Sequence, residues 1–364
     1  MRRSGLGLYD GAVEPKHRKG SLPRTAVSIQ DVADRAGVSI ATVSRVLNTP
    51  GMVAAETAER VRAVVAELGY VPNVSAQSLV TRSSRLLAMA LPDIHGEFYS
   101  ALLRGADAEA KKLGYHLLVS SGQGRAMEND LGLGPLLGLV DGVAVMITEP
   151  NEALIRRVTT AGMPMVVLDS APEGTKLDSI EIDNEAGATA ATEHLLTLAR
   201  PERCFFIGGP KDNFDTKERA AAFVRAVADA ARRRGSPVSA SVAYGDYSFD
   251  WGKQRAEEMI ATGTLAPDSA PMGVLAGNDE IAYGVMHAAR EAGIAVPGGL
   301  AVVGFDDTRL ASLVRPTLST VRVPLSEVGA TAVQLLVRRI KDPQAAPMHV
   351  RLTPSLIVRQ TTRP

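Results

Sequence analysis

Residues 28–48 read SIQDVADRAGVSIATVSRVLN, and this stretch decides the fold of the N-terminal part of the chain. Its first half repeats apolar residues at helical spacing, namely Ile29, Val32, Ala33 and Ala36. Ser28 can cap this helix, and Gly37 can end it because glycine adopts the left-handed conformation without steric cost. The second half shows the same spacing behind a possible capping residue, Ser39, at Ile40, Val43, Val46 and Leu47. We therefore expect two short helices joined by a tight turn.

Such a pair of helices has two interpretations. One is a helix-turn-helix, whose second helix fits the major groove of DNA. The other is an ordinary helical hairpin that belongs to a hydrophobic core. The spacing of the apolar residues is the same in both cases, so it does not choose between them.

The residues that follow favour the first interpretation. A third run of helical spacing contains Val61, Val64, Val65 and Leu68, and Gly69 ends it. The segments DVADRAGVS (31–39), ATVSRVLN (41–48), ELGYVPN (67–73) and AQSL (76–79) then stand in a fixed order. In that order and spacing the chain resembles the lactose-repressor and purine-repressor family of bacterial transcription regulators. The resemblance extends from Val27 to the C-terminus.

This resemblance implies a set of DNA-contacting residues. Ile40 and Ala41 occupy the positions that choose bases in the family, and Arg45 is expected to contact bases or phosphates. Residues 74–85 match the hinge helix and linker, and Leu79 matches an apolar wedge that enters the minor groove. A plain linker with an incidental leucine is the alternative for Leu79. The full predicted set is Ser28, Ser39, Ile40, Ala41, Thr42, Ser44, Arg45, Asn48, Asn73, Ala76 and Leu79.

The charge distribution fits a nucleic-acid partner at one end of the chain. The 364 residues carry no formal net charge, but eleven Lys and Arg face only seven Asp and Glu in the first 82 residues. An excess of basic residues in one module suits a phosphate backbone. Double-stranded DNA is therefore the predicted macromolecular partner.

Other features exclude several classes of protein. Cys204 is the one cysteine, so an intramolecular disulfide or a cysteine metal cluster is excluded, and its apolar neighbours predict a buried thiol. No run of 18 apolar residues is present, and residues 1–26 lack the apolar stretch of a secretory signal. We expect a cytoplasmic protein with a disordered tail over residues 1–26 and no membrane partner. The histidines are scattered and no catalytic motif occurs, so no catalytic residue, metal or cofactor is predicted.

From residue 86 the pattern changes to alternating strands and helices. Expected strands are 86–91, 115–119, 141–147, 163–169, 204–207, 273–276 and 301–305. Expected helices are 99–113, 184–198, 217–234, 251–262, 279–293 and 325–340. This alternation predicts parallel sheets covered on both faces. The predicted fold is an N-terminal all-α helix-turn-helix domain followed by an α/β core of two doubly wound parallel-sheet lobes.

The resemblance gives this core a periplasmic-binding-protein-like architecture and sets its boundaries. The helix-turn-helix domain covers 27–73, and residues 86–364 form the effector-binding and dimerisation core of a homodimer. The first lobe takes about 86–183 and 324–351, and the second takes about 184–321 and 354–364. Two departures from the family stand out. Ala54 lacks the usual capping serine of the third helix, and the glycines and proline within 126–140 predict a broken helix.

In open α/β sheets, ligands bind beyond the carboxyl ends of the strands. Carboxylates, amides, an arginine and aromatic rings follow the predicted strands, a mixture that suits a small polyhydroxylated ligand. These positions are Asp93, Phe98, Tyr99, Ser120, Ser121, Thr148, Glu149, Asp169, Ser170, Asn213 to Arg219, Asp246, Tyr247, Asn278, Asp279, Asp306 and Asp307.

The resemblance selects some of these positions as effector-binding. Arg219 matches a ligand-clamping arginine, and Asp306 matches a ligand-binding aspartate. Asn278 and Tyr247 match an effector contact and a stacking aromatic. Each of the four also fits a structural role, such as a helix cap or a turn. Phe98 and Tyr99 fit ligand contact and simple packing equally, and Asp279 is expected to cap a helix.

The sequence thus predicts a homodimeric repressor that binds a palindromic operator and responds to a small-molecule effector, in this family most often a sugar or sugar derivative. A purine or another metabolite is the alternative effector. A solute-binding protein of the same fold is disfavoured by the added N-terminal module. An α/β enzyme would need a catalytic base with a partner, and none is evident.

Overall fold

The computed structural model describes residues 27–48, 50–71, 83–122, 138–149, 151–160, 162–170, 176–199, 201–267 and 270–363. Contacts divide the chain into two compact units, Met1–Arg82 and Ser83–Pro364. The tail expected at residues 1–26 lies outside the described residues, and so does the stretch 73–82 on which the hinge helix was expected.

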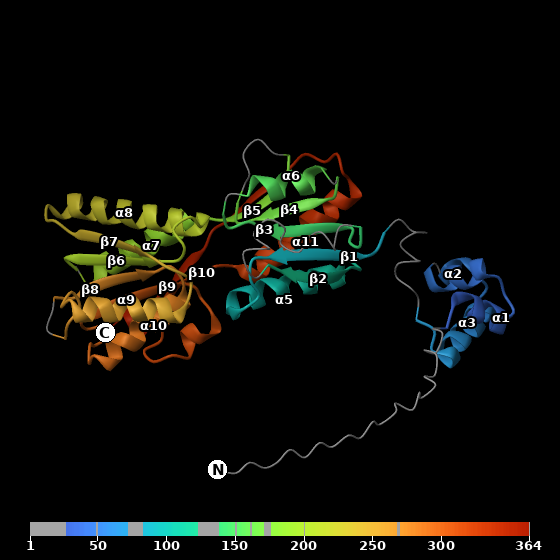
Figure 1. Ribbon diagram of the computed structural model, residues 1–364, viewed down its shortest axis with the longest axis horizontal. Helices are drawn as coiled ribbons and strands as arrows, with labels where there is room; N and C mark the ends of the chain where they lie inside the picture. The colour runs from blue at the N-terminus through green and yellow to red at the C-terminus, as the bar shows by residue number, and fades with distance from the viewer. Residues whose placement is uncertain are drawn as a thin grey trace, which may run out of the picture. The chain divides into compact units, whose positions relative to one another are not determined.

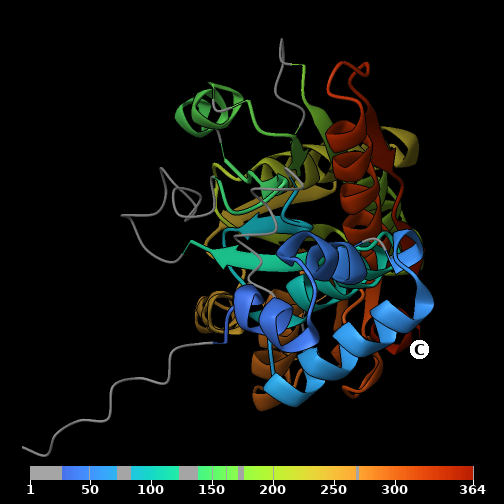
Figure 2. The same cartoon turned by 90° about the vertical axis from the view of Figure 1, so that its right-hand side faces the viewer.

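The N-terminal unit is a three-helix domain, which confirms the predicted helix-turn-helix. Its helices are α1 (Ile29–Ala36), α2 (Ile40–Asn48) and α3 (Ala55–Leu68), with a 3-10 turn η1 (Pro50–Met52) between the last two (Figures 1 and 2). Ser28 and Asp31 form a capping box at the start of α1, and Gly37 ends it at φ 65°. Val32, Val43 and Val61 are fully buried where the helices meet. The apolar spacing of residues 28–48 thus forms one shared core.

The core unit contains two six-stranded sheets. The first has the strand order β11-β5-β4-β3-β1-β2, and every neighbouring pair is parallel. Its strands are β1 (Leu86–Leu91), β2 (His116–Ser121), β3 (Gly142–Met146), β4 (Met165–Leu168), β5 (Asp178–Ile182) and β11 (His349–Leu352). Helices α5 (Gly96–Lys112) and α11 (Leu325–Lys341) cover one face, and α6 (Glu152–Thr160) packs on the other (Figure 1).

The second sheet has the order β12-β10-β9-β8-β6-β7, in which only β12 is antiparallel to its neighbour. Its strands are β6 (Arg203–Gly208), β7 (Ser239–Tyr244), β8 (Met272–Ala276), β9 (Leu300–Asp306), β10 (Ser319–Arg322) and β12 (Ser355–Ile357). Helices α7 (Asn184–Ala199) and α8 (Phe214–Arg234) lie on one face, and α9 (Phe249–Ala261) and α10 (Asp279–Glu291) lie on the other (Figure 1). The predicted two-lobed α/β fold is confirmed.

The chain passes between the two lobes three times. It leaves the first sheet after β5 and enters the second lobe with α7. It returns between β10 and α11, and it crosses again between β11 and β12. Each crossing is short, so a change in the angle between the lobes must act on these three segments.

Helices α5 and α11 approach so closely that their glycines are required. A Cβ on Gly329 would lie 2.0 Å from the carbonyl oxygen of Leu102, and one on Gly105 would lie 1.9 Å from that of Ser326. The two backbones therefore touch directly, and this contact fixes α11 in the first lobe although it follows strands of the second.

Several sequence predictions need comment. Cys204 is buried with 1% of its surface exposed, as predicted. The broken helix expected over 126–140 falls outside the described residues up to residue 137. Within the part of the chain that the structure describes, no helix is long and apolar enough to cross a membrane.

The first prediction concerns the start of α3. Ala54 is its N-cap residue and makes no side-chain capping bond. Ala54→Ser should stabilise α3 by ~1 kcal/mol, because a serine oxygen can accept a backbone N–H of the first turn. Hydrogen exchange of the full-length protein would show slower exchange in peptides from residues 50–68. Ala55→Ser, one residue inside the helix, is the control and should not slow exchange; equal rates for Ala54→Ser and wild type would contradict the prediction.

Candidate functional site

The second helix of the N-terminal unit presents a polar face to solvent. Ile40 is 42% exposed, Ala41 and Arg45 are exposed, and Thr42 and Ser44 are half-exposed. Val43 and Val46, on the opposite face, are buried against α1 and α3. Arg45 makes no hydrogen bond or ion pair to any residue that the structure describes. Its guanidinium is therefore available for a base edge or a phosphate.

Two other predicted DNA-contacting residues have structural roles. The Ser28 hydroxyl accepts the backbone N–H of Asp31, and the Ser39 hydroxyl accepts that of Thr42 at 3.1 Å. Both serines are exposed at helix N-termini, where an approaching phosphate finds unsatisfied backbone N–H groups. Asn73, Ala76 and Leu79 lie outside the described residues, as does the side chain of Asn48.

In the core unit, a cavity of about 440 Å³ lies at the carboxyl ends of strands from both sheets. All six residues predicted to bind effector line it: Phe98, Tyr99, Arg219, Tyr247, Asn278 and Asp306. Other lining residues were noted from their places after strands, namely Asp93, Thr148, Glu149, Asp169, Asn213 and Asp215. Ser120, Ser121, Asp246 and Asp307 do not line it. Residues that follow strands of both lobes therefore line one site, as expected from the rule that ligands bind beyond the carboxyl ends of strands.

Arg219 forms the floor of this cavity and is 3% exposed. Its Nε donates to Asn184 Oδ1 at 2.7 Å, Nη1 donates to the Gly277 carbonyl at 2.7 Å, and Nη2 donates to Asp215 at 3.0 Å. The guanidinium carbon also lies 3.8 Å from the centre of the Phe305 ring. Burial disfavours its charge, but Asp215 and other carboxylates more than offset this and raise the pKa of Arg219. Arg219 is therefore a fixed cation.

Asp306, at the end of β9, has an unusual environment. It is 7% exposed and lines the cavity, and its Oδ1 has no hydrogen-bond partner among the described residues. Its φ of 106° is a strained value for a residue with a Cβ. Burial raises the pKa of the Asp306 carboxyl well above its usual range, Arg219 opposes this, and Asp279 adds to it. An unpaired buried oxygen of this kind is a natural acceptor for a ligand.

Asp169 faces the cavity from the first lobe, directly after β4, with φ 65°. Its carboxylate makes no hydrogen bond within the described part of the chain. Burial and the neighbouring carboxylate of Asp215 raise its pKa well above the usual range, against the influence of Arg219. Asp169 and Asp306 thus present two unpaired carboxylates from opposite lobes.

Two other predicted ligand residues, Asn278 and Tyr247, already use part of their hydrogen-bonding capacity within the protein. Asn278 is the N-cap of α10, and its Oδ1 accepts the backbone N–H of Ile281 at 2.9 Å. The Tyr247 hydroxyl lies 2.7 Å from Thr216 Oγ1 and donates to Asn213 at 3.2 Å. Only the ring of Tyr247 is then left for a ligand.

Phe98 and Tyr99 make an edge-to-face pair with centroids 5.1 Å apart. Both rings are partly buried against the core, and both line the cavity. Both rings therefore pack against the core and also line the cavity. Burial has the largest effect on the pKa of the Tyr99 hydroxyl and raises it, and the nearby charges of Asp169 and Asp93 raise it further. The hydroxyl therefore stays protonated and can donate a hydrogen bond.

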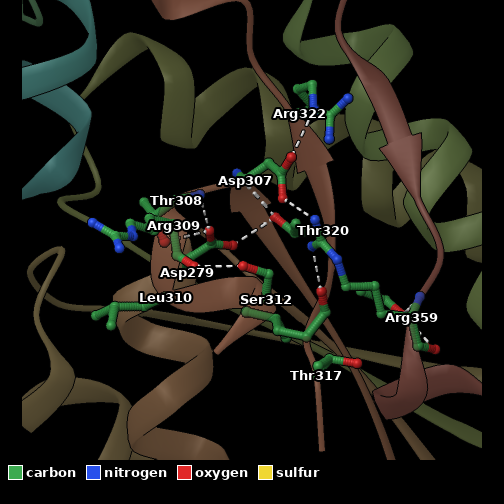
Figure 3. Close-up of polar contacts among 12 residues, drawn as sticks. Asp279, Asp307, Thr308, Arg309, Leu310, Ser312, Thr317, Thr320, Arg322 and Arg359 are labelled. Carbon is green, nitrogen blue, oxygen red and sulfur yellow. Dashed lines mark hydrogen bonds and ion pairs between the residues drawn. The ribbon is translucent and has the colours of Figure 1, made fainter. Parts of the chain in front are cut away.

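The prediction for Asp279 was wrong. Asn278 caps α10, and Asp279, one residue later, is fully buried and bonded to residues of other elements (Figure 3). Its Oδ2 accepts the backbone N–H of Thr308 at 2.7 Å and the Thr308 hydroxyl at 2.9 Å, and its Oδ1 accepts the Thr320 hydroxyl at 2.5 Å. Burial raises the pKa of Asp279 to about 7, although these bonds act in the opposite direction.

The neighbouring Asp307 joins the cavity wall to two of the crossings. Its carboxylate accepts from Arg322 Nε and from Arg359 Nη2, both at 2.6 Å (Figure 3). Arg322 ends β10, just before one crossing, and Arg359 follows β12, just after another. The strained pair Asp306–Asp307 is therefore held to the segments that connect the lobes.

The polar lining residues Glu97, Ser248, Glu280 and Thr308 were missed. Glu97 and Glu280 lie in the first turns of α5 and α10, and Ser248 caps α9. Glu97 directly precedes the predicted Phe98, Ser248 directly follows the predicted Tyr247, and Glu280 lies two residues beyond the predicted Asn278. The first helical turn after a strand therefore faces the cavity along with the strand end.

Comparison with known proteins places the chain among transcription regulators. Residues 28–73 match the model of bacterial regulatory proteins of the lacI family, and residues 192–362 match a periplasmic binding protein-like domain. The catabolite control protein A of Priestia megaterium is 32% identical over 93% of this chain and 99% of its own length. The ribose operon repressor of Escherichia coli K12 is 31% identical over 91% and 98%.

Solved structures give the same result. The lac repressor dimer bound to operator and the anti-inducer ONPF has a TM-score of 0.79 and 30% identity, covering 93% of this chain and 99% of that one. A complex of the transcriptional regulator CelR with cellobiose has a TM-score of 0.67 and 28% identity, covering 92% and 99%.

The raised pKa of Asp279 generates a prediction about pH. A carboxyl whose folded pKa of about 7 exceeds its usual 3.8 stabilises the fold at low pH, and this contribution is lost as pH rises toward 7. The free energy of unfolding should fall by on the order of 2 kcal/mol between pH 5 and pH 8. Asp306 and Asp169 act in the same sense. Urea unfolding of the full chain, followed by the fluorescence of its single Trp251, measures this.

Asp279→Asn should flatten the pH dependence, since the amide does not titrate. Asp250→Asn, an exposed position in the first turn of α9, is the matched control and should leave the dependence of wild type intact. A pH dependence that is identical in Asp279→Asn and wild type would assign it to other groups.

Proposed function

Because this chain belongs to the lacI family of bacterial regulatory proteins and is a transcription repressor with an effector-binding core, we propose that it binds a palindromic operator as a homodimer and responds to a sugar or sugar derivative. The observation that carries the effector part is the convergence of Arg219, Asp306 and Asp169 on one cavity between the lobes. The proposed place of action is the cytoplasm, where the DNA is.

On the DNA side, α2 enters the major groove with its exposed face. Ile40 and Ala41 contact base edges, and Thr42, Ser44 and Arg45 contact bases or phosphates. Ser28 and Ser39 bring helix N-termini to the DNA backbone, and Asn48 is a further proposed contact. Asn73, Ala76 and Leu79 enter the minor groove, with Leu79 as a wedge at the operator centre.

A homodimer follows from the way such a domain reads DNA. One helix-turn-helix covers a half-site, so two copies related by a two-fold axis read a palindrome. In the second lobe, Phe249, Leu310 and Leu313 are 36%, 44% and 56% exposed. Phe249 lines a hollow of about 540 Å³ together with Val314, from the same loop as the two leucines. An exposed apolar surface of this kind supports self-association.

The polar groups of the cavity suit an effector with several hydroxyls. Carboxylate and amide oxygens accept from neighbouring hydroxyls, and the rings of Tyr247 and Phe98 can cover the apolar face of a sugar. A purine is the second candidate, because a relative at 30% identity is a purine-type repressor, PurR of Vibrio parahaemolyticus. The two binding equilibria are linked: if the ligand changes the affinity for the operator by some factor, the operator changes the affinity for the ligand by the same factor.

Arg45→Ala tests the operator interface. On a palindromic site selected from random duplexes, specific binding should weaken by about 1–3 kcal/mol, since a bidentate contact to guanine is lost. Binding to an unrelated duplex should weaken much less. Gel shift at one fixed salt concentration measures both. Arg62→Ala, exposed on α3, is the charge-matched control; an equal loss on both duplexes for Arg45→Ala would remove it from base readout.

Arg219→Ala tests the cleft. In a thermal-shift screen of sugars and purines, any compound that stabilises wild type should fail to stabilise this variant, because the cavity loses its fixed cation and Asp215 keeps only its hydrogen bond from Asn184. Arg225→Ala, an exposed position on the same helix, should keep the response. A ligand whose shift survives in Arg219→Ala binds elsewhere and refutes the cleft assignment.

A further inference from the structure

The effector cavity carries a large excess of negative side chains. Among the described residues that line it, seven are carboxylates: Asp93, Glu97, Glu149, Asp169, Asp215, Glu280 and Asp306. The basic side chains among the same residues are Arg219 and His95. A site built in this way disfavours an anion, because water-poor surroundings strengthen the repulsion between like charges.

The two basic side chains do not remove this excess. Arg219 already donates to Asp215, Asn184 and a backbone carbonyl, so its charge is matched inside the protein. His95 lies at the mouth of the cavity, and its Nδ1 is 2.6 Å from Asp93 Oδ1. Each basic group therefore has one carboxylate of the lining as its hydrogen-bond partner. Arg219 also lowers the pKa of Asp306 and Asp169, but it forms no hydrogen bond with either.

Two of these carboxylates lack hydrogen-bond partners among the described residues. Asp306 is more than nine-tenths buried, lines the cavity, and has an Oδ1 without a partner among the described residues. Asp169 lies across the cavity on the other lobe and also makes no hydrogen bond within the described part of the chain. Two carboxylates without hydrogen-bond partners that line one cavity favour a ligand group that is positive or donates hydrogen bonds.

The carboxylates of the cavity also raise the pKa values of neighbouring groups. Burial, followed by Asp93 and Glu97, raises the pKa of Glu280. Asp169, Asp93, Asp306 and Asp215 all add to the effect of burial on the pKa of Tyr99. The raised values extend over both lobes, so the negative potential belongs to the whole cavity.

We propose that the effector is a hydroxylated compound that carries a protonated amine, and that Asp306 and Asp169 bind this amine and join the lobes through it. An ammonium group has three donors and can satisfy both carboxylates at once. Among the described residues, no three His, Cys, Asp or Glu gather closely enough to hold a metal ion, so the proposal names an ammonium group as the cation. This inference rests on the proposed effector function of the cleft.

The test compares matched ligands that differ in charge. Isothermal titration of the full-length protein uses three series on the same rings: hexoses, the corresponding 2-amino-2-deoxyhexoses, and the hexose 6-phosphates. For at least one ring, the amine should bind about tenfold tighter than the neutral sugar, as expected for one added charge-assisted hydrogen bond. The phosphate of that ring should not bind. A phosphate that binds as tightly as the neutral sugar, or an amine series without a binder, overturns the inference.

Two variants distinguish a direct contact with the amine from the overall negative potential of the cavity. Asp306→Asn and Asp169→Asn should each reduce the amine's advantage over the neutral sugar to about twofold. Asp246→Asn, next to the cavity but outside its lining, should preserve it. An advantage that persists in both cavity variants would place the amine elsewhere and refute the proposal.

The outcomes also distinguish this inference from the proposed function. A neutral sugar or purine that binds and needs Arg219 keeps the cleft as the effector site, and it overturns only the amine. A protein that binds the operator while no compound of any class binds the cleft in an Arg219-dependent way overturns both.

Discussion

The structure of the core depends on one buried guanidinium. Arg219 can be charged in the interior only because Asp215, Asn184 and the Gly277 carbonyl receive its hydrogens, and because Phe305 lies under its plane. A buried cation without these partners would cost several kcal/mol. The partners come from α7, α8 and the end of β8, so satisfying the charge fixes the ends of three elements and thereby the floor of the cavity.

The same interaction determines the charge that a ligand meets. Because Arg219 donates its hydrogen bonds to other partners, it only partly offsets the effect of burial on Asp306 and Asp169, and the pKa values of both carboxyls stay raised. Such unpaired charges destabilise the protein without ligand, which is the usual cost of a preorganised site. The strained φ of 106° at Asp306 is a second cost of the preorganised site. The backbone is held in this conformation because Asp307, the next residue, binds Arg322 and Arg359.

The sequence predicts those parts of the fold whose cause is local. The apolar runs of the inner strands and the caps around Gly37 depend on residues within one turn or strand, and they formed where expected. Strands β5, β7, β10 and β11 were not predicted. Strands β7 and β11 lie at sheet edges and bury few side chains, and β10 reads STVR, which is no apolar run although most of it is buried. Strand β5 contains the fully buried Asp178, whose partners Arg338 and Arg339 lie 160 residues or more away. No local pattern reveals such a pair. In the site, the strand-end rule found the acidic residues but could not show which of them were already paired.

Coupling between cleft and DNA-binding unit must begin at the crossings. Asp307 binds Arg322 before one crossing and Arg359 after another, so a ligand that moves Asp306 acts on both segments through one residue (Figure 3). At the other end of the core, Asp141 accepts from Ser83, Ser84 and the backbone of Arg85, where the chain enters the first lobe. The entry of the chain is thus fixed to the first lobe, while Asp306 belongs to the second. A change in the angle between the lobes therefore moves the entry point relative to the ligand, and in a homodimer it would move the two entry points relative to each other.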